Sequence, residues 1–333
     1  MPPITPPTIT TALLAFILPL AATIILTPLL IKTLTNRGTL VQDYHKPNRP
    51  LIPKPGGPAI LLPLILGELT IYLATESTGA LALMLVTAIA GVIGVIDDVY
   101  ALSGVLKPAL LMTASLPILL LGTYDFHPEF PLFGGVRLSI IYPLLVLIAI
   151  PVTANTVNTI DVLNGAVSGF TAIASIPLIL ALALKGGITT ALIALPLLSV
   201  SLGFFIFHRF PSKIFPGDSG SLSLGALYGA LAVVGGVEVV GIVALLPAIL
   251  NSFFFLSSVR RLVEHRKVKE RPTKVLGENR LAASRSGSAP ITLVRLILAD
   301  GPLTEREVVL NIFKVTAFSA GLAIVTAVLT WVI

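Results

Sequence analysis

The chain has 333 residues, of which 55% are hydrophobic and only 11% are charged. An ordinary soluble domain carries roughly a quarter charged residues, so this composition, with a mean hydropathy of +0.98, excludes that class and predicts a membrane protein. The absence of cysteine excludes disulfides and thiolate metal sites. The formal net charge of +6 has to be located along the chain before it can be interpreted.

Apolar runs between polar breaks predict an all-α polytopic membrane protein with about ten transmembrane helices. The segment before the first run, Met1 to Thr10, lacks Lys and Arg, so that run is expected to be a retained span and not a secretory signal. We expect one integral membrane domain over residues 1–333, with a basic cytoplasmic loop at 258–310. The predicted spans cover residues 10–33, 57–74, 79–96, 106–122, 138–154, 165–184, 187–207, 221–236, 238–257 and 311–332.

The cations predict the orientation in the membrane. With ten spans both termini lie on one side, and of the 22 Lys and Arg residues only Arg137 and Lys185 lie on that side. The positive-inside rule then places the cation-rich loops in the cytoplasm and both termini outside. We therefore expect an integral protein of a prokaryotic plasma membrane whose active site faces the cytoplasm.

Two polar loops carry local signals. The longer loop on the side of the termini, Gly122 to Arg137, holds Asp125, His127 and Glu129; a solvated loop is favoured over a metal site there. In the last cytoplasmic loop the alternating run Ile291 to Leu298 predicts a short strand. Residues 304–307, Thr-Glu-Arg-Glu, predict a capping box that opens the last helix.

Two adjacent carboxylates, Asp97 and Asp98, end an apolar run at the predicted cytoplasmic boundary. Charges at that depth are costly unless something compensates them. Lys107, nine residues after Asp98, is the only cation in this loop. A lysine beside carboxylates can bind phosphate while the carboxylates hold Mg²⁺. The pair is either a solvated helix end or a metal or phosphate site.

The next cytoplasmic loop carries Asn155, Asn158 and Asp161 at intervals of three residues, followed by Asn164 and Gly165. On a helix the first three would form one polar stripe. Amide and carboxylate oxygens at membrane depth suit Mg²⁺, which also takes ligands from substrate phosphates and water. The competing interpretation is polar contact between helices.

A turn precedes the predicted eighth span, with the sequence Phe-Pro-Gly-Asp-Ser-Gly-Ser at residues 215–221. Gly217 and Gly220 allow a tight turn that can approach an anion, and Ser219 or Ser221 can cap the following helix. The positive N-terminus of that helix favours phosphate. Asp218 at the turn is a candidate metal ligand, although capped loops of this composition are common.

Two basic stretches remain. The first runs from Asp43 through Lys46 to Pro50 and continues as a Pro/Gly-rich segment, Ile52 to Pro58; it predicts either a stiffened loop or a cover for a lipid phosphate. The second contains Arg260, Arg261, Glu264, His265, Arg266, Lys267 and Arg271. It predicts orientation by attraction to anionic lipid, or pyrophosphate and nucleotide binding by arginine.

Taken in order on one membrane face, these loops resemble the polyprenyl-phosphate N-acetylhexosamine-1-phosphate transferase family, glycosyltransferase family 4 type. The resemblance covers nearly the whole chain. Within the family, the chain is most similar in character to the archaeal and eukaryotic dolichyl-phosphate GlcNAc-1-phosphate transferases. Four motifs carry it: Asp-x-x-Lys-Pro with Pro-x-x-Gly-Gly, Asp-Asp with Lys107 downstream, Asn-x-x-Asn-x-x-Asp-x-x-Asn-Gly, and Phe-x-Gly-Asp-x-Gly-Ser.

The resemblance implies a role for each matching position. Asn158 and Asp218 would bind Mg²⁺, with Mn²⁺ as a substitute, and Lys107 would contact phosphate. Asp97 and Asp98 would lie near the metal or act as a base, and Asp161 would join them as a catalytic residue. The implied substrate-binding residues are Asp43, Lys46, Asn155, Asn164, Gly217, Arg260, Arg261, His265 and Arg266.

The implied reaction transfers GlcNAc-1-phosphate, or a related HexNAc-1-phosphate, from a UDP-sugar to a polyprenyl or dolichyl phosphate and releases UMP. A muramoyl-pentapeptide substrate is the alternative, but that subfamily carries a run of histidines where this chain has only His265. An ion-coupled transporter would place its polar residues near mid-membrane. A purely structural membrane protein would not need five acidic positions at one face. A homodimer is left open, and no nucleic-acid partner is expected.

Overall fold

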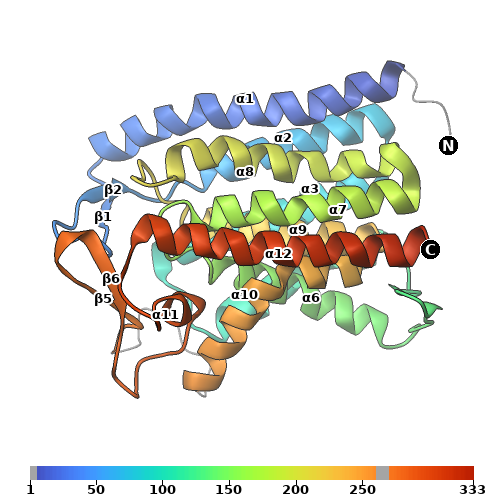
Figure 1. The fold of residues 1–333 in the computed structure, drawn as a ribbon. Coiled ribbons are helices and arrows are strands. Elements are labelled where there is room, and N and C mark those ends of the chain that lie inside the picture. The colour runs from blue at the N-terminus through green and yellow to red at the C-terminus, as the bar shows by residue number, and fades with distance from the viewer. Residues whose placement is uncertain (1–5, 260–269) are drawn as a thin grey trace.

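A computed structural model describes residues 6–259 and 270–333 as a bundle of helices lying side by side (Figure 1). The described helices are α1 (Pro6–Asn36), α2 (Pro58–Thr75), α3 (Thr78–Tyr100), α4 (Leu106–Leu111), α5 (Leu116–Leu120), α6 (Tyr142–Asn158), α7 (Ala166–Ala191), α8 (Leu195–His208), α9 (Gly217–Val234), α10 (Glu238–Val259), α11 (Leu293–Ile297) and α12 (Glu305–Trp331).

Each predicted span coincides with helical structure, but the number of membrane crossings is not settled by that agreement. Within the described ranges, six helical segments are long and apolar enough to cross a membrane. One of them, Ala166–His208, has 43 residues and contains two predicted spans, separated where Gly187 departs from helical geometry. Leu106–Leu120 and Tyr142–Asn158 are shorter apolar helices. Ten crossings therefore stay a prediction.

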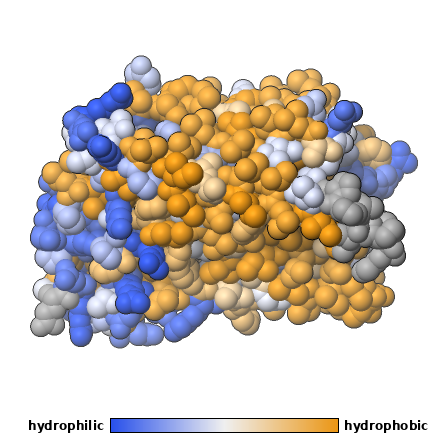
Figure 2. All heavy atoms as spheres, turned by 90° about the horizontal axis from the view of Figure 1, so that it is seen from above, coloured by the Kyte–Doolittle hydropathy of each residue, from blue (hydrophilic) through white to orange (hydrophobic). Residues whose placement is uncertain are grey.

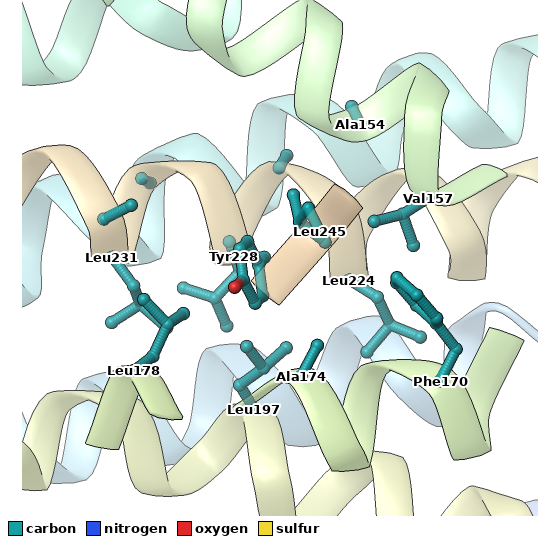
Figure 3. Packing of buried hydrophobic residues seen from close by; sticks show 14 of the residues in the cluster. Ala154, Val157, Phe170, Ala174, Leu178, Leu197, Leu224, Tyr228, Leu231 and Leu245 are labelled. Carbon is teal, nitrogen blue, oxygen red and sulfur yellow. The ribbon is translucent and has the colours of Figure 1, made fainter. Parts of the chain in front are cut away.

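The core of the bundle surrounds α9, which is buried along nearly its whole length. Leu224, Tyr228 and Leu231 of this helix meet side chains from α6, α7, α8 and α10 (Figure 3). Because lipid tails are as apolar as these side chains, their packing is stabilised by close van der Waals contact and not by removal of surface from water. The first turn of α9 is thereby held in place among the ends of its neighbours.

Short strands lie at both ends of the bundle. The antiparallel pair β1 (Leu40–Gln42) and β2 (Leu51–Pro53) lies near the three-stranded sheet of β5 (Thr273–Val275), β6 (Arg280–Ala283) and β7 (Leu303–Thr304), in the order β5-β6-β7 (Figure 1). The pair β3 (Glu129–Phe130) and β4 (Gly134–Gly135) lies at the other end. The last polar loop thus contains strands, although not at the predicted run Ile291 to Leu298.

The strand predicted at 291–298 is wrong, because most of that run forms α11. The Thr292 hydroxyl accepts a hydrogen bond from the Arg295 backbone N–H, and this cap favours a helical turn over the alternating pattern. The capping box of α12 is confirmed: Thr304 and Glu307 exchange side chain-to-backbone hydrogen bonds.

Polarity divides the molecule along its length. Hydrophilic side chains gather at the end that carries β1, β2 and β5–β7, while a broad hydrophobic surface covers much of the remaining face (Figure 2). α1 begins and α12 ends at the opposite end (Figure 1). With an even number of membrane crossings, the start of α1 and the end of α12 must lie on the same side of the membrane, as they do here.

Candidate active site

The turn that opens α9 is held by a carboxylate from another helix. Asp98, near the end of α3, accepts hydrogen bonds from the backbone N–H groups of Asp218 and Ser219, each at 2.9 Å, and from the Ser219 hydroxyl at 2.7 Å. The first N–H groups of a helix have no partner within it, and negative charge is favourable there. Asp98 therefore fixes the position of Asp218.

The prediction that Ser219 or Ser221 caps this helix is wrong. α9 begins at Gly217, four residues before the predicted span, so both serines lie inside its first turns. The Ser221 hydroxyl instead donates to the Asn158 side-chain oxygen at 2.6 Å.

Glycine is required where α3 and the turn meet. Gly217 has φ +73°, and a Cβ there would lie 2.7 Å from one oxygen of Asp98 and 2.8 Å from the other. At Gly94 on α3, a Cβ would lie 2.4 Å from the Ser219 Cα. Only a missing side chain allows this backbone approach.

Lys107 links two of the predicted carboxylates. Its Nζ lies 2.6 Å from Asp97 Oδ2 and 2.6 Å from Asp218 Oδ1. The three side chains are only 12%, 3% and 11% exposed, in the order Lys107, Asp97, Asp218. Asp97 also accepts the Leu102 N–H at 2.7 Å, which fixes it at the end of α3. The buried carboxylates of Asp97 and Asp218 thus both point to the place that the Lys107 ammonium occupies, and a cation is favoured there.

Asn158, the last residue of α6, joins this cluster. Its side-chain N–H donates to Asp218 Oδ1 at 3.1 Å. Asn155, one turn earlier, donates to the Pro151 carbonyl of its own helix, and no described contact brings it to the cluster. The continuous polar stripe is also wrong for Asp161, because α6 ends at Asn158 and the chain turns before α7 begins.

Asp161 nonetheless faces the site from that turn. Its side chain is 16% exposed, and His208 Nε2 lies 3.7 Å from its Oδ1. Burial raises the pKa of Asp161 to about 7; the Lys54 ammonium lowers it, while Asp218 and Asp98 add to the rise. This carboxyl group therefore changes charge near neutral pH.

A second network lies beside the first and joins three distant segments. Lys46 forms ion pairs with Asp43 and, at 3.3 Å, with Glu305 Oε2, and it donates to Asn164 Oδ1 at 3.1 Å. The Asn164 backbone N–H donates to Glu305 Oε1 at 2.8 Å. Burial raises the pKa of Asp43, but the hydrogen bonds from Lys46 and Asn164 outweigh it and hold that pKa below its usual value.

Lys54 lies beside the cluster, although the sequence indicated only the Pro/Gly-rich segment that contains it and not this residue. Its Nζ lies 3.8 Å from Asp98 Oδ1, and among the described contacts it makes no hydrogen bond. Lys46 and Lys107 are each held between two carboxylates, so the positive charge of Lys54 is less compensated than that of either of these two lysines. In the sequence, the position of Lys54 in a Pro/Gly-rich stretch that leads into the next span was the signal that could have indicated a role at the site.

Two cavities open next to these groups, of about 560 and 250 Å³. Both are lined by Tyr44, His45, Asp161 and Arg271, and the smaller also by Lys54. Burial, with Arg271 and Lys46 nearby, lowers the pKa of His45 to about 4 despite the opposing effect of Asp43, so this histidine lines the cavities as a neutral ring.

The structure thus brings most predicted residues into two adjoining networks. The first contains Asp97, Asp98, Lys107, Asn158, Gly217 and Asp218; the second contains Asp43, Lys46 and Asn164. Asp161 lines the space next to both, and Asn155 stays apart. Arg260, Arg261, His265 and Arg266 lie outside the described residues. Glu305 was missed because its place in a capping box accounted for it locally.

Within 6–259 and 270–333, no group of three or more His, Asp or Glu side chains is arranged to hold a metal ion. The oxygens that meet at Lys107 belong to two carboxylates; the Asn158 amide beside them turns its N–H to Asp218 and its oxygen to Ser221. Such a set fits Mg²⁺, which is usually bound through one or two carboxylates and completed by substrate phosphates and water.

The long apolar helices and the charged site at one end define an integral membrane protein. The sequence profile of glycosyl transferase family 4 matches residues 80–236. A relative in Methanocaldococcus jannaschii, provisionally named a glycosyltransferase, is 30% identical over 278 residues, covering 83% of this chain and 84% of the relative. The chain belongs to glycosyl transferase family 4.

Two further relatives carry more specific provisional names. A UDP-N-acetylglucosamine–dolichyl-phosphate N-acetylglucosaminephosphotransferase of Sulfolobus acidocaldarius is 26% identical over 330 residues, covering 96% of this chain and 97% of the relative. An undecaprenyl-phosphate N-acetylglucosaminyl 1-phosphate transferase of Bacillus subtilis is 32% identical over 225 residues, covering 66% of this chain and 62% of the relative.

Proposed function

We propose that this protein transfers GlcNAc-1-phosphate, or a related HexNAc-1-phosphate, from a UDP-sugar to a polyprenyl or dolichyl phosphate. UMP is released and a lipid-linked pyrophosphate sugar is formed. The observation that carries the proposal is the meeting of Asp97 and Asp218 at Lys107, at the polar end of an apolar bundle. A water-soluble nucleotide sugar and a membrane-bound phosphate can both reach such a place. The names of the relatives point to the same substrates.

We assign the metal site to Asp218, with Asn158 and Asp97 beside it. Bound there, Mg²⁺, or Mn²⁺ in its place, would neutralise the negative charge of the diphosphate. Lys107 already lies between the two carboxylates, so it is well placed to contact a phosphate that approaches them. Asp98 would act by holding the turn of α9 and not by taking a proton, because its oxygens already accept three hydrogen bonds.

The remaining chemistry needs little activation of the nucleophile. A phosphate monoester is already an anion near neutral pH, and its oxygen would attack the β-phosphorus of the UDP-sugar. The bond from that phosphorus to the UMP oxygen then breaks, and UMP leaves. Catalysis would come mainly from alignment of the two substrates, and we favour a single displacement for that reason. Lys54 supplies a second cation for the incoming phosphate.

The cavities favour the nucleotide sugar as their occupant. The larger volume, about 560 Å³, lies within the roughly 300–1,000 Å³ typical of ligand pockets. Its walls combine the ring of Tyr44, stacked under the Arg271 guanidinium at 4.7 Å, with polar groups from Asn251 and Thr159. We place this end of the bundle in the cytoplasm, as the cation distribution predicts.

The ion-coupled transporter fits the structure less well. A transport site would lie near the middle of the bundle. The charged cluster instead lies where α3 and α6 end and α9 begins. The same position suits a reaction at the membrane boundary.

The test is incubation of purified protein with radiolabelled UDP-GlcNAc and dolichyl or undecaprenyl phosphate, with and without EDTA. We expect a labelled lipid and UMP in equal amounts, both abolished by EDTA. Asp218→Ala should abolish the product while the variant stays folded, whereas Asp125→Ala at the opposite end should not change it. Labelled lipid at the wild-type rate from Asp218→Ala would remove that residue from the site. No lipid product with any UDP-HexNAc would contradict the proposed function.

A further inference from the structure

The β3–β4 hairpin presents an apolar tip at the end of the bundle opposite the candidate active site (Figure 1). Backbone hydrogen bonds extend the hairpin beyond its two short strands: Val136 N–H donates to the Pro128 carbonyl at 3.0 Å. The loop between the strands holds Leu132 and Phe133, which are 75% and 85% exposed. Large apolar side chains exposed to this degree and next to each other in a turn mark a contact surface.

The backbone at this tip is strained in a way that glycine would relieve. Leu132 has φ +65°, in the left-handed region that side chains with a Cβ rarely adopt. At Gly134, two residues later, φ is also positive, but there the residue is a glycine, which adopts this conformation without strain. A leucine kept in that conformation indicates that its side chain serves a purpose at the tip.

The polar side chain at the base of the hairpin is turned towards the protein. Glu129 pairs with Lys185 at 3.0 Å and accepts a hydrogen bond from the Trp331 indole N–H at 2.6 Å. These contacts tie the hairpin to α7 and to the end of α12. The base is therefore fixed, and the apolar tip is held in a defined position relative to the bundle.

The tip continues the lipid-facing surface of the bundle. Leu120, at the end of α5, is 81% exposed; Ile140 and Ile141, just before α6, are 87% and 55% exposed. Trp331 forms a hydrogen bond with the base of the hairpin, and tryptophan is enriched where a membrane meets water. A soluble partner would have to cover a surface that runs directly into the one facing lipid.

We propose that Leu132 and Phe133 insert into the lipid leaflet at this end of the bundle, with the hairpin acting as an interfacial anchor. The apolar tip thus lies at the boundary between the lipid headgroups and the acyl chains. A second copy of this chain or bulk water at the tip would give different quenching results.

The chain contains one tryptophan, Trp331, so a single fluorescent reporter is easily built. In a Trp331→Phe background, Phe133→Trp is reconstituted into phosphatidylcholine nanodiscs whose acyl chains carry bromine either near the headgroup or near the methyl end. We expect the shallow bromines to quench the fluorescence more than the deep ones. Aqueous iodide should have little effect.

Leu276→Trp in the same background is the matched control, because Leu276 is an exposed apolar residue at the polar end of the bundle. Iodide and not bromine should quench it. A Phe133→Trp reporter that behaves like this control would overturn the proposal. Shielding from both quenchers, with the mass of a dimer, would overturn it in favour of self-association. Leu132→Trp repeats the measurement in case Phe133→Trp does not fold.

Discussion

Replacement of Gly217 by alanine tests the contact that positions Asp218. The new Cβ would lie 2.7 and 2.8 Å from the two oxygens of Asp98 and 2.8 Å from the Pro55 Cβ. Those oxygens are held by three hydrogen bonds and cannot move aside freely. A side chain at φ +73° costs ~1–2 kcal/mol, and forced close contact costs ~1–3 kcal/mol more. We therefore expect a loss of about 3 kcal/mol in the free energy of unfolding.

Two other glycines separate these costs. Gly122 has φ +63° with nothing within 4 Å of an added Cβ, so Gly122→Ala should lose only the backbone part, ~1–2 kcal/mol. Gly277 has neither strain nor neighbours within 4 Å, so Gly277→Ala should stay within about 0.5 kcal/mol of the wild type. Chemical unfolding in detergent measures all three.

Activity provides the second readout of the same series. Misplacement of a catalytic group by about 1 Å can reduce a rate about 100-fold, and we expect a loss of that order in UMP release from Gly217→Ala. Both control variants should keep wild-type activity. If Gly217→Ala lost no more stability than Gly122→Ala and released UMP at the wild-type rate, the tight contact between the turn and Asp98 would be refuted.

Three further substitutions test the charged groups. Lys46→Met should lower the free energy of unfolding by ~3–5 kcal/mol because it leaves two buried carboxylates without their cation. Lys32→Met, at an exposed position, should leave that free energy nearly unchanged. Equal losses for the two variants in unfolding assays would contradict this. In metal-free protein the raised pKa of Asp161 makes the free energy of unfolding fall as pH rises from 3.8 to about 7. The stability of Asp161→Asn relative to the wild type should therefore increase across that window and stay constant above it. A difference in unfolding free energy that does not change with pH would contradict this. Lys54→Gln should raise the KM for the polyprenyl phosphate about tenfold with a smaller change in kcat; an unchanged KM in the UMP-release assay would remove Lys54 from the phosphate site.

Much of the site was predictable because its motifs lie at the ends of apolar helices. Asp97, Asn158 and Asp218 each follow or precede a run long enough to be recognised in the sequence. Since the positive-inside rule assigns those ends to one side, their loops were expected to meet, and the structure shows contacts among Lys107, Asn158 and Asp218.

The missed details depend on contacts between distant residues. No local pattern shows that Glu305 reaches the backbone of Asn164, 141 residues away, because its place in a capping box already explains it. Likewise Asp98 reads as a possible base until its carboxylate is seen to cap α9. The end of α6 at Asn158 moved Asp161 off the expected stripe, since a spacing of three residues does not fix where a helix stops.

Mn²⁺ binding, measured by electron paramagnetic resonance with Mn²⁺ replacing Mg²⁺ and UDP-GlcNAc present, tests directly whether Asp218 and Asn158 hold a metal ion. The side chains of Asp218 and Asn158 come from α9 and α6 and lie 3.1 Å apart through the Asn158 amide nitrogen, so the amide would turn its oxygen towards an ion that both side chains bind. We predict that wild-type protein binds one Mn²⁺, that Asp218→Ala and Asn158→Ala each weaken the binding at least tenfold, and that Asp125→Ala binds normally. Unchanged Mn²⁺ affinity in both site variants would show that these two side chains do not bind the ion.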